Sequence, residues 1–293
     1  MNTICFVLYD MTGPEAAETA ENLREETGEA WDVTAVSVSD FLLKMNGNDE
    51  HPSDGDSANE RPGKDMFPAE TLFLTDCDSA IRTLKEKGLP VCGYAHAGSR
   101  ARGEHLKGVD YIVEEPAMIP ADSYQKIYER AAGLPWTILE TKRCVVRELT
   151  PEDAEAVLAL YDSEARRFLE APQDDPAQER EILEAYAQKV YRLYGYGTWG
   201  IFSKENGQLI GRAGFEPYTG DDDAMHFGYL IHRDWRGQGY AFEACAAILR
   251  YGKEALGFEK ITAETAKENK ASAALLKKLG FELRECDRII ASL

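Results

Sequence analysis

The sequence lacks an excess of positive charge, long apolar runs and closely spaced cysteine pairs. Its 33 lysines and arginines stand against 52 aspartates and glutamates, which gives a net charge of -19 at neutral pH. Binding to a nucleic acid requires a basic face, so this composition predicts no nucleic-acid partner. Such acidity is typical of a soluble surface, and it would also attract a cationic amine.

Membrane and secretion signals are missing as well. No apolar stretch approaches the roughly 20 residues of a membrane-spanning helix. The apolar run Ile4–Tyr9 near the start has no basic flank of the kind found in secretion signals. The six cysteines are scattered, mostly within apolar segments, which favours buried free thiols over disulfides. We therefore predict a cytoplasmic protein without a membrane partner, and no pattern in the sequence specifies an oligomeric state.

The chain is about twice as long as a typical domain, and its pattern changes near the middle. Residues 46–66 have almost no apolar side chains and are rich in Asp, Glu, Gly and Pro, so we expect an acidic mobile loop there. Short apolar strands alternate with helices around that loop, which predicts a parallel, Rossmann-like α/β accessory domain over residues 1–135. A linker, 136–142, would then lead to a second domain, 143–293.

The second domain has a different order of elements. It begins with a strand at Cys144–Leu149, and a run of consecutive strands follows a long helix. This order predicts a mixed sheet flanked by helices on both faces. The expected helices are Pro176–Leu193, Tyr240–Leu256 and Ala271–Leu279, and the main expected strands are Thr198–Ser203, Leu209–Tyr218, Met225–His232, Lys260–Thr265, Phe281–Arg284 and Ile289–Ser292.

A glycine-containing turn joins one of these strands to the helix that starts at Tyr240. In Arg236-Gly237-Gln238-Gly239 the glycines allow a tight turn, so consecutive N–H groups can point at one spot above the positive end of the helix. That arrangement suits a pyrophosphate. The spacing Arg-x-x-Gly-x-Ala differs from the GxGxxG of a dinucleotide site, and the GK[ST] of a P-loop is lacking.

The pattern Arg236-x-x-Gly239-x-Ala241 resembles the acyl-CoA loop of the GNAT superfamily of N-acetyltransferases, which reads Gln/Arg-x-x-Gly-x-Gly/Ala. Further motifs resemble the branch that acetylates the N-termini of ribosomal proteins. These motifs are Gly228-Tyr229-Leu230, Phe242-Glu243-Ala244 and Asn269-x-x-Ser272 with the closing Lys278-Leu279-Gly280-Phe281. The similarity covers about half of the chain. It implies that residues 143–293 form a GNAT domain that uses acetyl-CoA as co-substrate.

The resemblance also implies which residues bind the co-substrate. The backbone of Leu230 and Ile231 would run beside the pantetheine arm, where the family's fourth and fifth strands part. Asn269 would bond the pantetheine or thiol region, although its position also suits a helix N-cap, and Ser272 would lie near the CoA tail. The N–H groups that would cradle the pyrophosphate belong to Arg236, Gly237, Gln238, Gly239, Tyr240 and Ala241.

Acetyl transfer requires a neutral amine to attack the thioester carbonyl, so a group near the amine must accept a proton. The related branch often has a Glu two residues before the Gly-Tyr pair, whereas this chain has His226 there. A histidine is a suitable base at neutral pH, and a hydrogen-bonded structural histidine is the alternative interpretation. Glu216, on the neighbouring expected strand, is the second candidate base.

Of two further positions, one departs from the family and one matches it. Many members have a Tyr in the last helix that acts as general acid for the thiolate, and the matching residue here is Leu276. A CoA thiolate is a tolerable leaving group, so turnover without that acid is chemically reasonable. Glu243 also matches a family position, and we expect it to have a structural role.

Asp10, Asp76 and Asp78 follow two apolar strands of the first domain and loosely resemble the Mg²⁺-binding strand ends of haloacid-dehalogenase-like phosphatases. Thr12 replaces the second Asp of that family's motif, and a clear phosphate-binding Lys is missing. We therefore interpret this half as a degenerate domain without catalysis, in which the aspartates cap helices.

The sequence as a whole predicts an N-acetyltransferase. It would move an acetyl group from acetyl-CoA to a primary amine, on a protein N-terminus or a small molecule, by direct attack. Two alternatives stay open at this point. One is a regulatory protein that binds acyl-CoA without turnover, and the other is a bifunctional protein with a phosphatase-like first half. No metal site is predicted.

Overall fold

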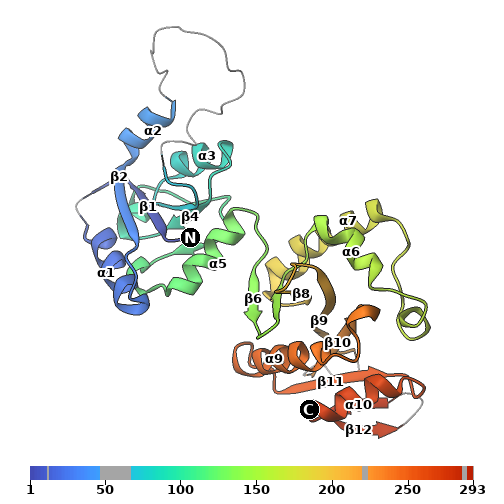
Figure 1. Cartoon of the computed structure of the whole chain (residues 1–293). Coiled ribbons are helices and arrows are strands. Elements are labelled where there is room, and N and C mark those ends of the chain that lie inside the picture. Colours follow the sequence, from blue (N-terminus) through green and yellow to red (C-terminus); the bar gives the residue numbers. More distant parts are fainter. Residues whose placement is uncertain (12, 47–66, 220–223, 286–288, 293) are drawn as a thin grey trace. The chain divides into compact units, whose positions relative to one another are not determined.

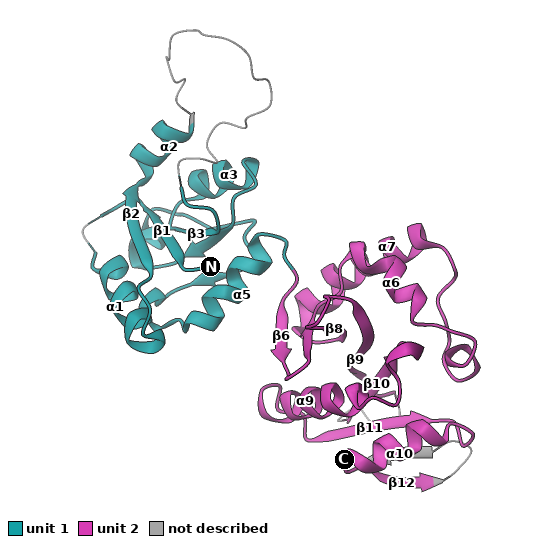
Figure 2. Ribbon diagram, viewed as in Figure 1, with its two compact units in different colours: residues 1–134 teal, residues 135–293 magenta. Residues whose placement is uncertain are grey.

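The computed structural model describes residues 1–11, 13–46, 67–219, 224–285 and 289–292. The expected acidic loop, 46–66, lies outside the described residues apart from its first position. The chain divides into two compact units, Met1–Leu134 (unit 1) and Pro135–Leu293 (unit 2), which Figure 2 shows in different colours. Among the described residues, no helix combines the length and the apolar character needed to cross a bilayer.

Unit 1 is built on a five-stranded sheet with the order β2-β1-β3-β4-β5, in which all neighbours are parallel. Figure 1 shows its helices on both sides of that sheet. The strands are β1 (Thr3–Leu8), β2 (Asp32–Ser37), β3 (Thr71–Thr75), β4 (Val91–Tyr94) and β5 (Ile112–Val113), and the helices are α1 (Glu15–Thr27), α2 (Val38–Asn46), α3 (Asp78–Glu86), α4 (Ala97–Ala101) and α5 (Ala121–Ala131).

Strand β1 shows why this unit has three layers. Its residues are fully or almost fully buried, and successive side chains point to opposite faces. Ile4 and Phe6 pack with residues of α1 and α5, whereas Cys5 and Val7 pack with residues of α2 and α3. The unit is therefore the parallel α/β sandwich that the alternation of strands and helices predicts.

Unit 2 contains an eight-stranded mixed sheet with the order β12-β13-β11-β10-β9-β8-β7-β6. Only the pair β10 and β11 is parallel among the described strand pairs of this sheet. The strands are β6 (Thr137–Glu140), β7 (Cys144–Arg147), β8 (Thr198–Ser203), β9 (Leu209–Pro217), β10 (Ala224–Ile231), β11 (Lys260–Thr265), β12 (Glu282–Glu285) and β13 (Ile289–Ser292), and the helices are α6 (Ala154–Ala159), α7 (Pro176–Tyr186), α8 (Arg192–Tyr194), α9 (Tyr240–Glu254) and α10 (Lys270–Lys278).

The main core of unit 2 lies between the sheet and α9. Trp199, Phe215 and Phe227 of the sheet meet Ala244 and Ile248 of α9 there, all of them buried. A smaller cluster joins α6 and α7 to other residues of the sheet. The fold class predicted from the sequence, a mixed sheet with helices plus a parallel α/β region, is confirmed. The five described cysteines are free and buried, as expected.

The expected linker is wrong in one respect. Residues 137–140 form strand β6, which pairs with β7 at the edge of the sheet of unit 2. The strand is short and only partly buried, so it lacks the apolar run by which the other strands were recognised. The expected single helix Pro176–Leu193 is also interrupted, because Ala187–Tyr191 forms a π-helical turn between α7 and α8.

Candidate active site

The loop before α9 has the backbone conformation that the sequence predicts. A 3-10 turn, Arg233–Trp235, follows β10, and the chain then passes through Gly237 and Gly239 to α9. Both glycines have positive φ angles, +74° and +85°, where a side chain would strain the backbone. These two residues therefore allow the turn to lead directly into the N-terminus of a 15-residue helix.

The N–H groups from Gly237 to Ala241 are left unpaired within the part of the chain that the structure describes. Glu243 donates the first backbone hydrogen bond of α9, to the carbonyl of Gly239. Among the described residues, the hydrogen bonds of the loop include none donated by the backbone N–H groups from Gly237 to Ala241. Together with the positive end of α9, they form a preorganised site for an anion such as a pyrophosphate.

Side chains on both flanks hold the loop in place. Arg236 donates to the Asp162 carboxylate through both terminal nitrogens, at 3.0 and 3.2 Å, and to Glu164 at 2.9 Å. Its Nε donates to the carbonyl of Ile231, at the end of β10. The guanidinium of Arg236 thus fixes the loop to the segment after α6. The backbone N–H of the same residue donates to the carbonyl of Arg233 at 3.3 Å, so it is not among the unpaired donors.

A second clamp was not predicted from the sequence. Arg143 donates from Nε to Glu243 at 2.7 Å and from a terminal nitrogen to the carbonyl of Gln238 at 3.1 Å, and its guanidinium lies 3.9 Å from the ring centre of Tyr240. Burial alone would raise the pKa of Glu243, but hydrogen bonds from Thr141 and Arg143 hold it below its usual value. Glu243 is thereby a positioning residue, which agrees with its expected structural role.

Strands β10 and β11 part beside this loop. They pair only at the start of β10, where Ala224, Met225 and His226 face Lys260 to Thr262. Beyond His226, β10 continues to pair with β9 on its other side as far as Ile231. Leu230 and Ile231 therefore do not pair with β11, although the Ile231 carbonyl accepts from Nε of Arg236. The resemblance implies such a separation for the strands that flank a pantetheine arm.

Tyr229 links β10 to α10 across the parting strands. Its hydroxyl lies 2.7 Å from Ser272 Oγ, and burial raises the pKa of Tyr229 to about 12. Asn269 accepts a hydrogen bond from the N–H of Ser272 at 3.0 Å, so it is the N-cap of α10. Leu276 of the same helix is completely buried in the main core, so its position contributes no general acid.

Both candidate bases line one cleft of about 150 Å³ in unit 2. His226 and Glu216 are directly opposite each other on β10 and β9, which places their side chains on the same face of the sheet. A Cβ added to Gly228 would meet nothing within 4 Å, so this glycine opens the floor of the cleft. The other lining residues are Tyr161, Leu169, Glu170, Thr198, Arg212, Gly214, Tyr229 and Leu230.

The carboxyl ends of the strands in unit 1 form a different arrangement. Asp76, after β3, is 1% exposed and accepts hydrogen bonds from the N–H of Tyr9, from Nε2 of His96 at 3.0 Å and from Arg102. His96 Nδ1 in turn accepts from the N–H of Gly98 at 3.3 Å. The Asp76 carboxylate is therefore committed to structural hydrogen bonds with neighbouring groups.

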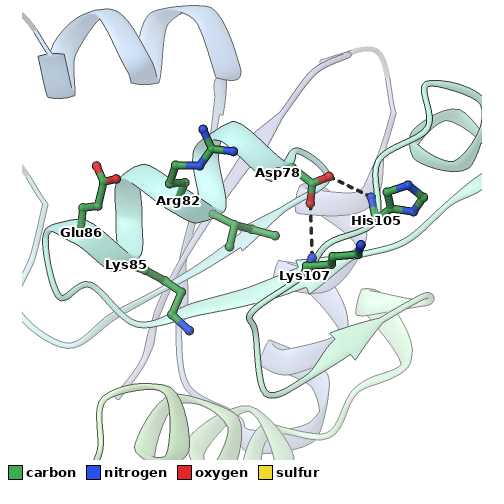
Figure 3. A pocket seen from close by; sticks show the side chains of 7 residues that line it. Asp78, Arg82, Lys85, Glu86, His105 and Lys107 are labelled. Carbon is green, nitrogen blue, oxygen red and sulfur yellow. Dashed lines mark hydrogen bonds between the residues drawn. The ribbon is translucent and has the colours of Figure 1, made fainter.

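Asp78 is also a structural residue. Its two carboxylate oxygens accept from the N–H groups of His105 and Lys107, at 3.0 and 3.3 Å, and these bonds lower its pKa despite the opposing effect of burial. Figure 3 shows this contact beside an open cavity of about 490 Å³, where Lys85 and Arg82 project from α3. The described residues contain no cluster of three or more His, Cys, Asp or Glu side chains placed to hold a metal. The resemblance to a phosphatase thus has no support here.

The comparisons with known proteins concern unit 2. The family model of the acetyltransferase (GNAT) domain matches residues 143–282. The uncharacterized N-acetyltransferase YoaA of Bacillus subtilis is 32% identical over 148 residues, which cover 50% of this chain and 82% of that protein. The [ribosomal protein uS5]-alanine N-acetyltransferase of Escherichia coli is 32% identical over 158 residues, which cover 52% of this chain and 81% of that enzyme.

Solved structures also match about half of the chain. The ribosomal-protein-S5-alanine acetyltransferase of Vibrio fischeri has 18% identity and a TM-score of 0.45, and the match covers 53% of this chain and 94% of that one. The ribosomal L7/L12 alpha-N-protein acetyltransferase, solved in complex with coenzyme A, has 17% identity and a TM-score of 0.47, with 54% and 97% coverage.

The chain belongs to the GNAT family of acetyltransferases. It is an acyl-CoA-dependent N-acyltransferase whose co-substrate is acetyl-CoA, so the family resemblance stated from the sequence is confirmed. The unpartnered N–H groups before α9 and the unpaired edge of β10 fit that co-substrate, because they offer donors for a pyrophosphate and a strand edge for an extended amide chain.

Proposed function

We propose that the chain acetylates the α-amino group at the N-terminus of a polypeptide, by direct attack of the amine on acetyl-CoA. The observation that carries this proposal is the cleft that brings His226 and Glu216 together beside Leu230, on the strand whose free edge is suited to the pantetheine arm. An amine in this cleft would meet a proton acceptor and the thioester in one place.

The chemistry favours an α-amine over a lysine side chain. Deprotonating a lysine at pH 7 costs about 4–5 kcal/mol, whereas an α-amine with a pKa near 8 costs only about 1 kcal/mol. A cleft of about 150 Å³ also suits a terminal residue with a small side chain. The curated relatives in Escherichia coli and Shigella flexneri are named for an alanine of a ribosomal protein, which is consistent with such an acceptor.

Separate groups of residues would bind the parts of acetyl-CoA. The N–H groups from Gly237 to Ala241 would bind the pyrophosphate, and the backbone of Leu230 and Ile231 would lie along the pantetheine arm. The N–H of Arg236, which the resemblance placed in the first set, donates instead to the carbonyl of Arg233. Asn269 and Ser272 would lie near the arm from the start of α10, where Ser272 already contacts Tyr229. Bound acetyl-CoA supplies the activated acyl group that the amine attacks.

The proposed transfer is a direct displacement at the thioester carbon. The amine nitrogen forms a bond with the thioester carbon, the carbon–sulfur bond breaks, and the CoA thiolate leaves. The proton released by the amine passes to His226 or Glu216, directly or through water. The ammonium form of the acceptor first loses one proton to water, which leaves the neutral amine that attacks, and the carboxylates of Glu170 and Glu216 in the cleft would favour entry of the cationic form.

In this proposal the first domain, 1–135, is an accessory domain without catalysis. The second domain begins near residue 136, because strand β6 belongs to its sheet. We place the reaction in the cytoplasm, because ribosomal proteins of the kind named for the relatives are made there. The chemistry itself needs only residues of unit 2.

The test is a turnover assay with acetyl-CoA and matched peptides. One set has a free Ala or Ser N-terminus and no lysine, and the other has a blocked N-terminus and a single lysine. We expect multiple turnovers on the first set, and a fall of about 10²-fold in kcat/KM for His226→Asn or Glu216→Gln, the larger effect identifying the base. Acetyl-CoA binding without turnover on any amine would instead support a regulatory protein, and preference for the lysine set would overturn the proposed acceptor.

A further inference from the structure

The π-helical turn Ala187–Tyr191 lets the side chains of Tyr186 and Tyr191 both contact the backbone of Thr198. In an α-helix, residues five apart point about 140° away from each other, but a π-turn adds a residue and places them on the same face. Tyr186 Oη accepts from the N–H of Thr198 at 2.9 Å, and Tyr191 Oη donates to the carbonyl of the same residue. The two rings meet edge to face with centres 5.0 Å apart.

Two glycines make this contact possible. A Cβ on Gly197 would lie 2.8 Å from Tyr186 Oη, and a Cβ on Gly214 would lie 2.0 Å from the carbonyl oxygen of Gly197. The backbone around Thr198 is thus held closely by the tyrosines on one side and by β9 on the other. Tyr191 is almost completely buried, so this arrangement is part of the rigid interior of unit 2.

The side chain of Thr198 points from this fixed backbone toward the cleft. Its hydroxyl donates to Glu216 Oε1 at 3.4 Å, and both residues line the cleft. The contact is long, as catalytic hydrogen bonds often are before substrate binds. Burial raises the pKa of Tyr186, and the charge of Glu216 adds to that effect.

We propose that Thr198 is a positioning residue for the Glu216 carboxylate, and that the π-turn with Tyr186 and Tyr191 holds Thr198 in the position that this requires. The hydroxyl occupies one carboxylate oxygen and leaves the other to face the amine. This inference rests on the proposed function, because it concerns the orientation of a candidate base in the acceptor cleft.

The experiment uses the full chain with four variants: Thr198→Val, Thr198→Ser, Glu216→Gln and the double variant that combines Thr198→Val with Glu216→Gln. Thr198→Val keeps the shape of the side chain and removes the hydroxyl, so we expect kcat/KM for the N-terminal peptide to fall about tenfold. Thr198→Ser should recover most of that loss, and the KM for acetyl-CoA should stay the same in both.

The double variant distinguishes a Thr198 hydroxyl that positions the Glu216 carboxylate from one that contributes to activity in another way. If Thr198 acts through Glu216, removing its hydroxyl in the Glu216→Gln background costs nothing further, within about twofold. A tenfold loss in that background as well would overturn the proposal, because the hydroxyl would then act independently of the carboxylate. Unchanged activity in Thr198→Val or in Glu216→Gln would overturn it too.

A second readout does not depend on the acceptor. The carboxyl ¹³C resonance of Glu216, assigned by its loss in Glu216→Gln, should shift in Thr198→Val and stay in place in Thr198→Ser. An unshifted resonance in Thr198→Val would overturn the contact, whichever amine the enzyme accepts. If no peptide is acetylated by the unaltered chain but the resonance shifts, the proposed function fails while the contact between Thr198 and Glu216 stands.

Discussion

The two units place polar groups at comparable points, where a strand ends and a helix begins, but they use them differently. In unit 1 the Asp76 carboxylate accepts from Tyr9, His96 and Arg102, and these groups satisfy one another. In unit 2 Arg143 and Arg236 hold the loop before α9 in place, and the backbone N–H groups from Gly237 to Ala241 have no acceptor among the described residues. The comparison shows that a binding site requires donors that are held rigidly and left unpaired.

The same contrast applies to packing. The strands of unit 1 bury both faces of β1, so little space is left along that strand. In unit 2, β10 and β11 separate after His226, and Gly228 leaves open space above the sheet. This contrast supports the proposal that the chemistry takes place in unit 2, where the sheet is interrupted, and that unit 1 is an accessory domain.

The largest expected effect is at the floor of the cleft. The Cβ of Gly228→Leu would meet nothing within 4 Å and its side chain would enter the cleft, so we expect acetyl transfer to fall at least about 100-fold while the unfolding temperature changes little. Peptide acetylation and thermal unfolding measure the two quantities. Gly214→Leu is the contrasting variant, because its side chain would overlap the backbone of Gly197 and prevent correct folding. A fully active Gly228→Leu variant would show that the acceptor binds elsewhere.

The next effect concerns the hydrogen-bonded cluster of unit 1. Asp76→Asn removes the charge that faces His96 and Arg102 in a buried position, and we expect unit 1 to lose about 3 kcal/mol of stability. Chemical denaturation followed by the fluorescence of Trp31, the tryptophan in this unit, would measure that loss. The kinetic constants of the folded protein should stay within about twofold. A large loss of activity without unfolding would contradict the purely structural role of this cluster.

A smaller change in stability is expected in unit 2. Tyr191→Phe removes a buried hydroxyl that donates to the carbonyl of Thr198 and accepts from the N–H of Leu149 at 3.3 Å. Leaving these two backbone groups without a partner should cost about 1–3 kcal/mol. Tyr194→Phe, at an exposed position near the end of the same helical segment, is the matched control and should change stability by less than about 0.5 kcal/mol. Equal effects of the two variants would show that the hydroxyl contributes nothing.

The smallest effect should come from the clamp on the loop. Glu243→Gln weakens the bonds from Arg143, so the loop loses part of its support, and we expect about a fivefold loss of affinity for acetyl-CoA. Glu254→Gln, at the exposed C-terminal end of α9, is the control and should leave the affinity unchanged. Calorimetric titration measures both. A gain in affinity for Glu243→Gln would mean that repulsion from its carboxylate outweighs the support that it gives.

Local patterns predicted the elements whose causes are local. The glycines before α9 have positive φ angles and the apolar runs form strands, since both effects depend on neighbouring residues. The family resemblance supplied His226, the neighbouring expected strand supplied Glu216, and the structure shows that they share one cleft. The roles of these residues stay predictions.

Contacts between residues far apart in the chain could not be predicted from the sequence. The clamp of Arg143 on Glu243 joins positions 100 residues apart, and no periodicity connects them. Strand β6 forms because it pairs with β7. Its own four residues carry no strand pattern, so the sequence alone predicted a linker there. The π-turn also escapes helical periodicity, because Tyr186 and Tyr191 share a face only after one extra residue enters the turn.

The most direct test of the account is calorimetric titration of acetyl-CoA into the full chain and two variants. Gly239→Glu and Gly257→Glu each place a glutamate at a glycine with positive φ, before and after α9, with no close contact at Gly257. We predict binding to the unaltered chain and to Gly257→Glu, and at least about 100-fold weaker binding to Gly239→Glu, because its carboxylate would repel the pyrophosphate. Equal affinities for the two variants would contradict the assignment of the loop before α9 as the acetyl-CoA site.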